Sequence, residues 1–289
     1  MNILLLIIVQ LLFAGNFVVA KLVIAEMPVL LLVAIRFIAM ASLVLCLLPF
    51  FWKSRPQFNI NFLVKSFALA GFGYCLTQFL MLKGIEYSKP SNVALITSLI
   101  PIVTLFIVIL KGQASLSKAK VGGFALSFIA VSLMLDFSKI SFGEGTLKGD
   151  AFALLAVCSL SYFLTSSKEY LKNNHVVWTN GFLFIFAAVQ SVPFLVYSSE
   201  KINFDYSMPV IWGVVYIVIA ATGFAYLLTN YLLKQLNPEI VSLYAYLQPI
   251  LVSLLSWLIL DTELELKVFV ATALLLLGFL LASKKPVQV

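Results

Sequence analysis

Long apolar runs, separated by short polar or charged stretches, dominate the pattern of hydrophobic and polar positions along the chain. A helix needs about 20 apolar residues to cross a bilayer, whereas an outer-membrane strand alternates apolar and polar positions with a period of two. The runs here are continuous, which favours helices. The pattern predicts ten spans, at residues 3–24, 28–51, 62–82, 91–110, 117–137, 149–171, 176–197, 209–233, 238–260 and 266–282.

The composition agrees with a membrane protein. Of the 289 residues, 62% are hydrophobic and 11% are charged, and the mean hydropathy is +1.08. A soluble domain has about half apolar and a quarter charged residues, so a soluble fold is excluded. We therefore expect an all-α integral membrane protein. The first apolar run lacks a basic leading segment and is too long for a signal peptide, so it should remain as the first helix.

The charged residues indicate an orientation in the membrane. Nineteen basic and twelve acidic residues give a net charge of +7, but they form no basic stripe of the kind that binds nucleic acid. With a cytoplasmic N-terminus, eleven basic residues fall in inner loops, seven fall in outer loops, and Arg36 lies inside a span. This bias predicts that both termini are cytoplasmic.

The residues that usually carry enzymatic or metal chemistry are few and scattered. Cys46, Cys75 and Cys158 lie inside predicted spans at no metal-ligand spacing, and the single histidine, His175, falls in a loop. No nucleophile and base converge in the sequence pattern. We therefore expect neither an enzyme nor a bound cofactor or metal.

Two pairs of segments repeat within the chain. Residues 71–80 (GFGYCLTQFL) and 223–232 (GFAYLLTNYL) share six of ten positions, and residues 90–101 and 238–249 share a proline at each end. A repeat of five helices is odd, so the second copy must cross the membrane in the opposite direction. We therefore expect two inverted five-helix repeats, at 1–138 and 148–285, an architecture of many secondary transporters.

Several short motifs resemble those of a known family. They are Phe13–Lys21, Arg36-Phe37, the prolines Pro101 and Pro249 in mid-helix, and Gly149-Asp150 at the start of the second half. Together with the repeat and the number of spans, they resemble the drug/metabolite transporter superfamily, specifically its EamA-like ten-helix branch. The resemblance implies a bundle with a central cavity that exports or exchanges amino acids and other small metabolites.

Arg36 is the charged residue that falls well inside a predicted span, about 12 Å from its outer end. An ion within the membrane suggests a functional site, and an arginine can hold a substrate carboxylate in a bidentate pair. Alternatively, Arg36 satisfies backbone carbonyls of a broken neighbouring helix or fixes the interface between repeats. The second half has Phe184 at the matching position, so the charge is not itself repeated.

Polar and aromatic residues in the spans complete the candidate substrate site. Tyr74 and Gln78 share one helical face, which Tyr226 and Asn230 repeat. Such faces suit an amphipathic or aromatic substrate, but they also join helices in bundles. Further candidates are Asn16, Tyr246 and Gln248 for binding, with backbone contact as the alternative for Asn16, and Pro101 and Pro249 as hinges or static kinks.

These observations favour a carrier of the bacterial inner membrane that exports or exchanges amino acids or related metabolites by alternating access. No carboxylate falls near the middle of a predicted span, so facilitative transport is favoured over proton coupling, with Glu26 and Glu169 as the acids that could still couple to protons. Arg36 favours a small-molecule substrate that bears a carboxylate or a phosphate, and the lipid bilayer is the other expected partner. The alternatives are uptake of a scavenged nucleotide derivative or amine, and a non-transporting membrane component.

Overall fold

The computed structural model describes residues 2–88, 93, 96–113, 117–134, 144–198, 205–260 and 266–282, and these form helices and connecting turns without a strand. The start of the span predicted at 91–110 and the end of that at 117–137 lie outside the described residues. In the first half the helices are α1 (Asn2–Glu26), α2 (Val29–Leu47), the 3₁₀ segment η1 (Leu48–Ser54), α3 (Ile60–Ala70), the π segment η2 (Gly71–Cys75), α4 (Leu76–Tyr87), α6 (Ile100–Leu110) and α7 (Lys118–Met134).

In the second half the helices are α8 (Glu144–Lys172), α9 (Val176–Ser198), α10 (Met208–Tyr216), the π segment η5 (Ile217–Phe224), α11 (Ala225–Gln235), α12 (Pro238–Leu243), the 3₁₀ segment η6 (Tyr244–Tyr246), α13 (Leu247–Leu260) and α14 (Leu266–Ala282). Where the structure describes them, these helices follow the apolar runs of the sequence to within a few residues. The chain is therefore all-helical in the described residues, as the hydrophobic pattern predicts.

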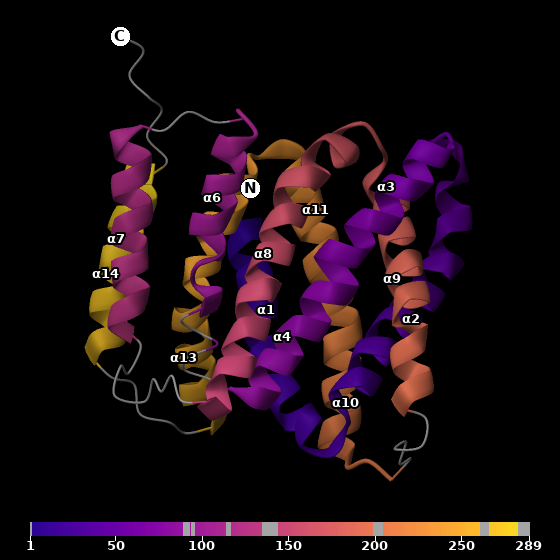
Figure 1. The fold of residues 1–289 in the computed structure, drawn as a ribbon, viewed down its shortest axis with the longest axis horizontal. Coiled ribbons are helices and arrows are strands. Elements are labelled where there is room, and N and C mark those ends of the chain that lie inside the picture. The colour runs from indigo at the N-terminus through magenta and orange to yellow at the C-terminus, as the bar shows by residue number, and fades with distance from the viewer. Residues whose placement is uncertain are drawn as a thin grey trace.

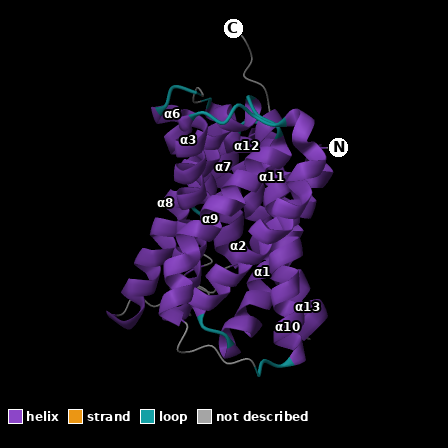
Figure 2. Cartoon of the chain, turned by 90° about the vertical axis from the view of Figure 1, so that its right-hand side faces the viewer, coloured by secondary structure: helices purple, strands orange, loops and turns teal. Residues whose placement is uncertain are grey.

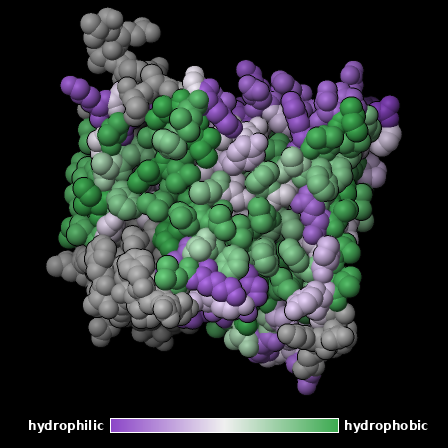
Figure 3. Space-filling view, in the orientation of Figure 1, coloured by the Kyte–Doolittle hydropathy of each residue, from purple (hydrophilic) through white to green (hydrophobic). Residues whose placement is uncertain are grey.

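Seven helical segments of the described residues are long and apolar enough to cross a membrane. They are Asn2–Glu26, Val29–Ser54, Ile60–Tyr87, Leu147–Lys172, Val176–Ser198, Met208–Gln235 and Pro238–Leu255. A broad band of hydrophobic side chains covers the middle of the face shown in Figure 3, with hydrophilic residues along its upper edge. The chain is thus a multi-pass membrane protein.

The helices stand side by side in one bundle (Figures 1 and 2). Its upper end, as drawn in Figure 1, contains the start of α1 and the end of α11, where Asn2 Nδ2 donates to Gln235 Oε1 at 3.2 Å. Its lower end contains the end of α1 and the start of α10, where Glu26 accepts hydrogen bonds from Ser207. We use "upper end" and "lower end" in this sense throughout.

Helices of the first half pack directly against helices of the second half. In the core, α2 packs against α9 and η5, while α9 also packs against η2, and α4 lies along α8. At one edge of the bundle α7 pairs with α14 (Figure 1). A Cβ atom at Gly278 of α14 would lie only 2.2 Å from Ser127 Oγ of α7, so glycine permits this close approach.

Two π segments interrupt the helices that carry the repeated sequence. Segment η2 begins at Gly71 and segment η5 ends at Phe224, so both fall at the repeated Gly-Phe pair. In η5 the Thr222 hydroxyl donates to the Ile217 carbonyl, five residues earlier, at 2.7 Å. The apolar pattern suggests regular helices here and does not reveal these turns, which are frequent at functional sites.

The two repeated prolines, Pro101 and Pro249, each lie just after a break in a helix. The sequence places Pro101 and Pro249 in mid-helix, but Pro101 lies in the first turn of α6 and Pro249 is the third residue of α13, after η6. Backbone N–H groups in the first turn have no partner within the helix, so proline is tolerated there. The prolines thus follow helix breaks, and their role as hinges stays a prediction.

Candidate functional site

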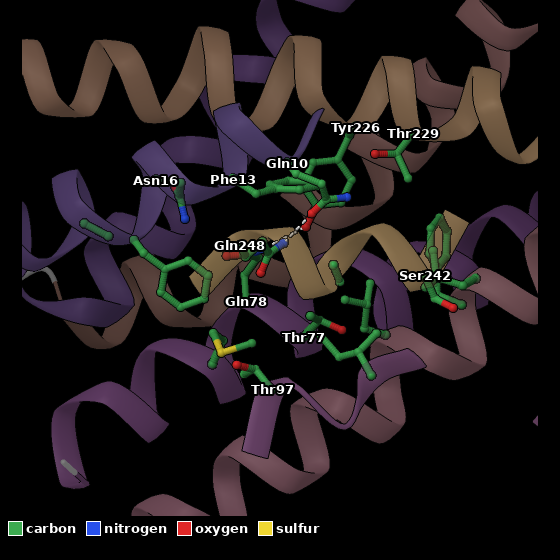
Figure 4. A pocket seen from close by; sticks show the side chains of 18 of the residues that line it. Gln10, Phe13, Asn16, Thr77, Gln78, Thr97, Tyr226, Thr229, Ser242 and Gln248 are labelled. Carbon is green, nitrogen blue, oxygen red and sulfur yellow. Dashed lines mark hydrogen bonds between the residues drawn. The ribbon is translucent and has the colours of Figure 1, made fainter. Parts of the chain in front are cut away.

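A cavity of about 100 Å³ lies among α1, α4, α6, α8, α11, α12 and α13 (Figure 4). Its polar lining consists of amides and hydroxyls, contributed by Gln10, Asn16, Thr77, Gln78, Thr97, Tyr226, Thr229, Ser242 and Gln248. Its aromatic walls are Phe13, Phe17 and Phe163. No carboxylate, ammonium or guanidinium is among the described residues that line it, so the cavity offers apolar surface with a few uncharged hydrogen-bonding groups.

A larger vestibule of about 780 Å³ adjoins this cavity and shares five of its lining residues, among them Phe17 and Gln248. The vestibule reaches Lys21, Glu26 and Ser207 at the lower end of the bundle. At the boundary between the two spaces, Gln248 Nε2 of α13 donates to Gln10 Oε1 of α1 at 2.8 Å (Figure 4). The cavity is therefore next to a space that extends to the lower end.

Polar contacts tie the helices together at the upper end. Lys120 Nζ lies 3.3 Å from a carboxylate oxygen of Glu239, whose side chain is buried. Lys111 Nζ donates to Ser166 Oγ at 2.7 Å, and partial burial of this ammonium lowers its pKa. Lys234 Nζ donates to the Asn174 carbonyl at 2.9 Å.

Lys168 of α8 also bonds to Asn237, just before α12. None of these upper-end residues lines the cavity or the vestibule. The upper end is thus held together by contacts among the ends of α6, α7, α8, α11 and α12, while the lower end is hollowed by the vestibule.

The guanidinium of Arg36 is fully enclosed and lies behind the cavity wall. Its Nε and Nη2 donate to Thr222 Oγ1 at 3.0 and 2.8 Å, and its Nη1 donates to Gln78 Oε1 at 2.6 Å. Gln78 Nε2 in turn donates to the Tyr226 hydroxyl at 2.8 Å. Gln78 and Tyr226 line the cavity, whereas Arg36 does not. The charge is therefore linked to the cavity through two uncharged side chains.

A second polar cluster surrounds Tyr74. Asn230 Nδ2 donates to the Tyr74 hydroxyl at 2.7 Å and to Asn180 Oδ1 at 2.9 Å, and the Tyr74 hydroxyl is 3.3 Å from the same Asn180 oxygen. All three side chains are buried, and none lines the cavity. This cluster joins α9, α11 and η2 within the core.

The two repeated tyrosines meet at the centre of the bundle. The ring centroids of Tyr74 and Tyr226 are 4.3 Å apart. Phe184, the counterpart of Arg36 in the second half, packs against both rings, at 5.2 and 6.3 Å. The structure thus brings together Arg36, Tyr74, Gln78, Tyr226 and Asn230, but it places only Gln78 and Tyr226 of these at the cavity.

The remaining candidates are distributed between the cavity and the core. Asn16 and Gln248 line the cavity. Tyr246 instead packs in a separate hydrophobic cluster with Leu105 and Phe124, and its hydroxyl has no hydrogen-bond partner among the described residues. The 3₁₀ segment η6 turns Tyr246 away from the cavity. A 3₁₀ helix has three residues per turn, so residues three apart, Ser242, Ala245 and Gln248, line the cavity.

Several polar residues of this region were not among the candidates from the sequence, and Gln10, Asn180 and Thr222 are three of them. Gln10 lies within the first apolar run and Asn180 within the run at 176–197. An isolated amide inside a span indicates a side chain that faces protein or water, and this pattern could have identified both residues. Thr222 gave no such signal, because a threonine inside a span commonly bonds to its own helix. Its contact with Arg36 depends on the packing of η5 against α2.

An apolar exterior, membrane-spanning helices and an internal cavity with apolar walls and a few uncharged polar groups are the features of a multi-pass membrane protein with space inside its bundle. The sequence model of the EamA-like transporter family matches residues 1–136 and 147–284. The chain therefore belongs to this family, a branch of the drug/metabolite transporter superfamily, and is a transporter and not an enzyme.

Individual relatives agree with this assignment. An uncharacterized transporter of Archaeoglobus fulgidus is 26% identical over 296 residues, which cover 99% of this chain and 98% of the relative. The uncharacterized transporter YetK of Bacillus subtilis is 24% identical over 284 residues, covering 95% of this chain and 84% of the relative. A protein crystal structure of 16% identity has the same fold, with a TM-score of 0.79 over 98% of this chain and 96% of that chain.

Proposed function

We propose that this transporter exports or exchanges amino acids or related small metabolites across the bacterial inner membrane by alternating access. The observation that carries the proposal is the cavity, which combines apolar walls with uncharged amides and hydroxyls and adjoins a vestibule at one end of the bundle. Such a lining suits a small amphipathic solute, because it removes apolar surface from water and still satisfies a polar head group.

A carboxylate is the head group that we propose for the substrate. The Arg36 guanidinium is buried, and no carboxylate among the described residues lies within ion-pair distance of it. A buried cation without a counter-ion gives the adjoining cavity a positive potential. A carboxylate entering beside Gln78 and Tyr226 would supply the missing negative charge.

The proposed topology has ten spans in two inverted repeats, 1–138 and 148–285, with both termini in the cytoplasm. Helices α6, α7 and α14 would add three shorter spans to the seven long ones. Two facts support this topology: the family model matches two separate stretches of the chain, and α1 begins and α14 ends at the upper end (Figure 1). Lysines at that end, such as Lys111 and Lys120, agree with a cytoplasmic side.

In this orientation the structure corresponds to an outward-open state. The vestibule would open to the outside near Glu26 and Ser207, while the contacts around Lys120 and Glu239 would close the cytoplasmic end. Alternating access would require these contacts to break as the vestibule closes. The uncharged lining of the cavity supports facilitative transport, because an acid that exchanges protons with the substrate would lie beside it, and Glu26 lines only the vestibule.

Transport into proteoliposomes tests the function. Purified protein would be reconstituted and assayed with a panel of labelled amino acids, nucleotides and amines, with and without a pH gradient. We expect uptake of one or a few amino acids at a rate that the gradient does not change. Uptake of amines or nucleotides alone would refute the amino-acid proposal, and dependence on the gradient would refute facilitative transport.

The accessibility of introduced cysteines tests the orientation and the open state. In a background without Cys46, Cys75 and Cys158, a membrane-impermeant maleimide added outside the cells should label Ala25→Cys, at the rim of the vestibule. The same reagent should label Lys172→Cys, exposed at the upper end, only after the cells are permeabilised. Labelling in the reverse order would contradict the proposed topology.

A further inference from the structure

The hydrogen bonds between Arg36 and the cavity have a fixed direction. A guanidinium has five N–H donors and no acceptor, so the atom of Gln78 that faces Arg36 Nη1 at 2.6 Å must be the amide oxygen. This assignment leaves the Gln78 amide nitrogen to face the Tyr226 hydroxyl at 2.8 Å. The hydroxyl oxygen therefore accepts this bond, and its own proton must go to another acceptor.

The opposite side of the guanidinium is fixed as well. Thr222 Oγ1 accepts from Nε and Nη2 of Arg36, and its hydroxyl donates to the Ile217 carbonyl in the π turn of η5. Thr222 thus has its donor engaged within its own helix and its lone pairs directed at Arg36. These contacts on both sides hold the guanidinium in place, and because it has no acceptor, the bond can run only from Arg36 to the Gln78 oxygen.

The cluster around Tyr74 lacks this directed arrangement. Asn230 donates to the Tyr74 oxygen, as Gln78 does to Tyr226, but the Tyr74 hydroxyl has the Asn180 oxygen within 3.3 Å as an acceptor. The Tyr74 hydroxyl therefore donates its proton to a residue of the core. No described residue accepts the Tyr226 proton, and Tyr226 lines the cavity. The two repeated tyrosines thus have different roles.

We propose that Tyr226 determines specificity by presenting its O–H group to a hydrogen-bond acceptor on the substrate, and that Arg36 is a positioning residue that enforces this polarity through Gln78. The head group must then accept a hydrogen bond, and the buried charge of Arg36 favours an anion such as a carboxylate, which binds to the phenol without touching Arg36. A phenol that already accepts a bond from a charge-assisted chain is a stronger donor. The inference deepens the proposed function, on which its reference to a substrate rests.

Two probes with opposite head groups test this polarity. 3-Phenylpropionate presents an acceptor, and 2-phenylethylamine presents a donor, on similar aromatic skeletons. Binding to the purified protein in lipid nanodiscs would be measured by titration calorimetry. We expect the wild type to bind the acid at least about tenfold more tightly, because one hydrogen bond to a charged group is worth about 1.5–3 kcal/mol.

The variant Gln78→Glu should reverse the preference. A carboxylate only accepts hydrogen bonds, so at this position it would accept from both Arg36 and the Tyr226 hydroxyl. Tyr226 would then present a lone pair to the cavity and favour the amine. The substitution keeps the size of the side chain and pairs the new charge with Arg36, so the variant should fold.

The added negative charge could favour the amine without any change in hydrogen-bond direction, so Tyr226→Phe must be combined with both backgrounds. If the hydroxyl carries the preference, Tyr226→Phe removes most of it in the wild type and in Gln78→Glu alike. A preference that survives Tyr226→Phe is due to charge alone and overturns the inference. Tyr170→Phe is the matched control, because it removes a buried hydroxyl that bonds to Ser66 away from the cavity.

The remaining outcomes are also decisive. Binding of neither probe to the wild type, or tighter binding of the amine, overturns the inference. Thermal unfolding of each variant shows whether it remains folded. Since the assay measures binding, it separates the inference from the proposed function: a protein that binds the acid through Tyr226 but transports no solute in proteoliposomes would refute the function alone.

Discussion

Replacement of Gly73 by alanine should distort the cavity wall. An ideal Cβ atom at this position in η2 would lie 2.2 Å from Cδ2 and 2.3 Å from Cγ of Phe163. Both atoms belong to the rigid ring of a buried side chain that lines the cavity and packs edge-on against the Tyr74 ring at 5.5 Å. The ring must therefore move as a whole, either towards Tyr74 or into the cavity.

The magnitude follows from two opposing effects. Forcing an additional methyl group into a packed core costs about 1–3 kcal/mol. Alanine in place of glycine also favours a helix by roughly 0.5–1 kcal/mol. Gly122→Ala supplies the matched control, because a Cβ atom at Gly122 in α7 has no atom within 4 Å. The difference between the two variants should then be about 1–3 kcal/mol, since both gain the same helical preference.

Thermal unfolding in detergent measures this difference. Gly73→Ala should unfold several degrees below Gly122→Ala, and the control should unfold at or slightly above the wild-type temperature. Transport by Gly73→Ala should also fall, because the displaced ring would occupy part of a cavity of only about 100 Å³. Equal unfolding temperatures for the two alanine variants would refute the close packing of η2 against Phe163.

Variants at three further contacts test the packing elsewhere in the bundle. Lys120→Met should lower the unfolding temperature by leaving the buried carboxylate of Glu239 unpaired. Lys120→Arg keeps a positive charge beside Glu239 and should unfold near the wild-type temperature. Gln248→Leu should cost about 1–3 kcal/mol by leaving the oxygen of Gln10 without a donor, and adding Gln10→Leu should recover most of the loss in the same unfolding assay. Gly278→Ala should separate α14 from α7 and lower the unfolding temperature.

Much of the fold was predictable because burial in lipid constrains composition directly. Helices are required where backbone groups have no water to bond to, so the continuous apolar runs located the helices to within a few residues. The repeated segments around Tyr74 and Tyr226 were equally visible, and the structure places these two rings together at the centre.

The identity of the cavity residues depended on local breaks in the helices. In a regular α-helix, Tyr246 would share a face with Ser242, four residues earlier, but the 3₁₀ turn η6 brings Ala245 and Gln248 to the cavity instead. Likewise, Tyr74 shares an ideal helical face with Gln78, yet it lies in η2 and only Gln78 lines the cavity. A pattern with one fixed period cannot locate a change of period.

The sequence by itself determined that the chain crosses the membrane as helices, that its two halves are related, and that Arg36 is a charge without an obvious partner. Only the tertiary structure decided what surrounds that charge. Thr222 is 186 positions away from Arg36, and it reaches the guanidinium because η5 packs against α2. Helix periodicity records which face is apolar, whereas contacts between distant helices depend on how those faces dock, and that is a property of the whole bundle.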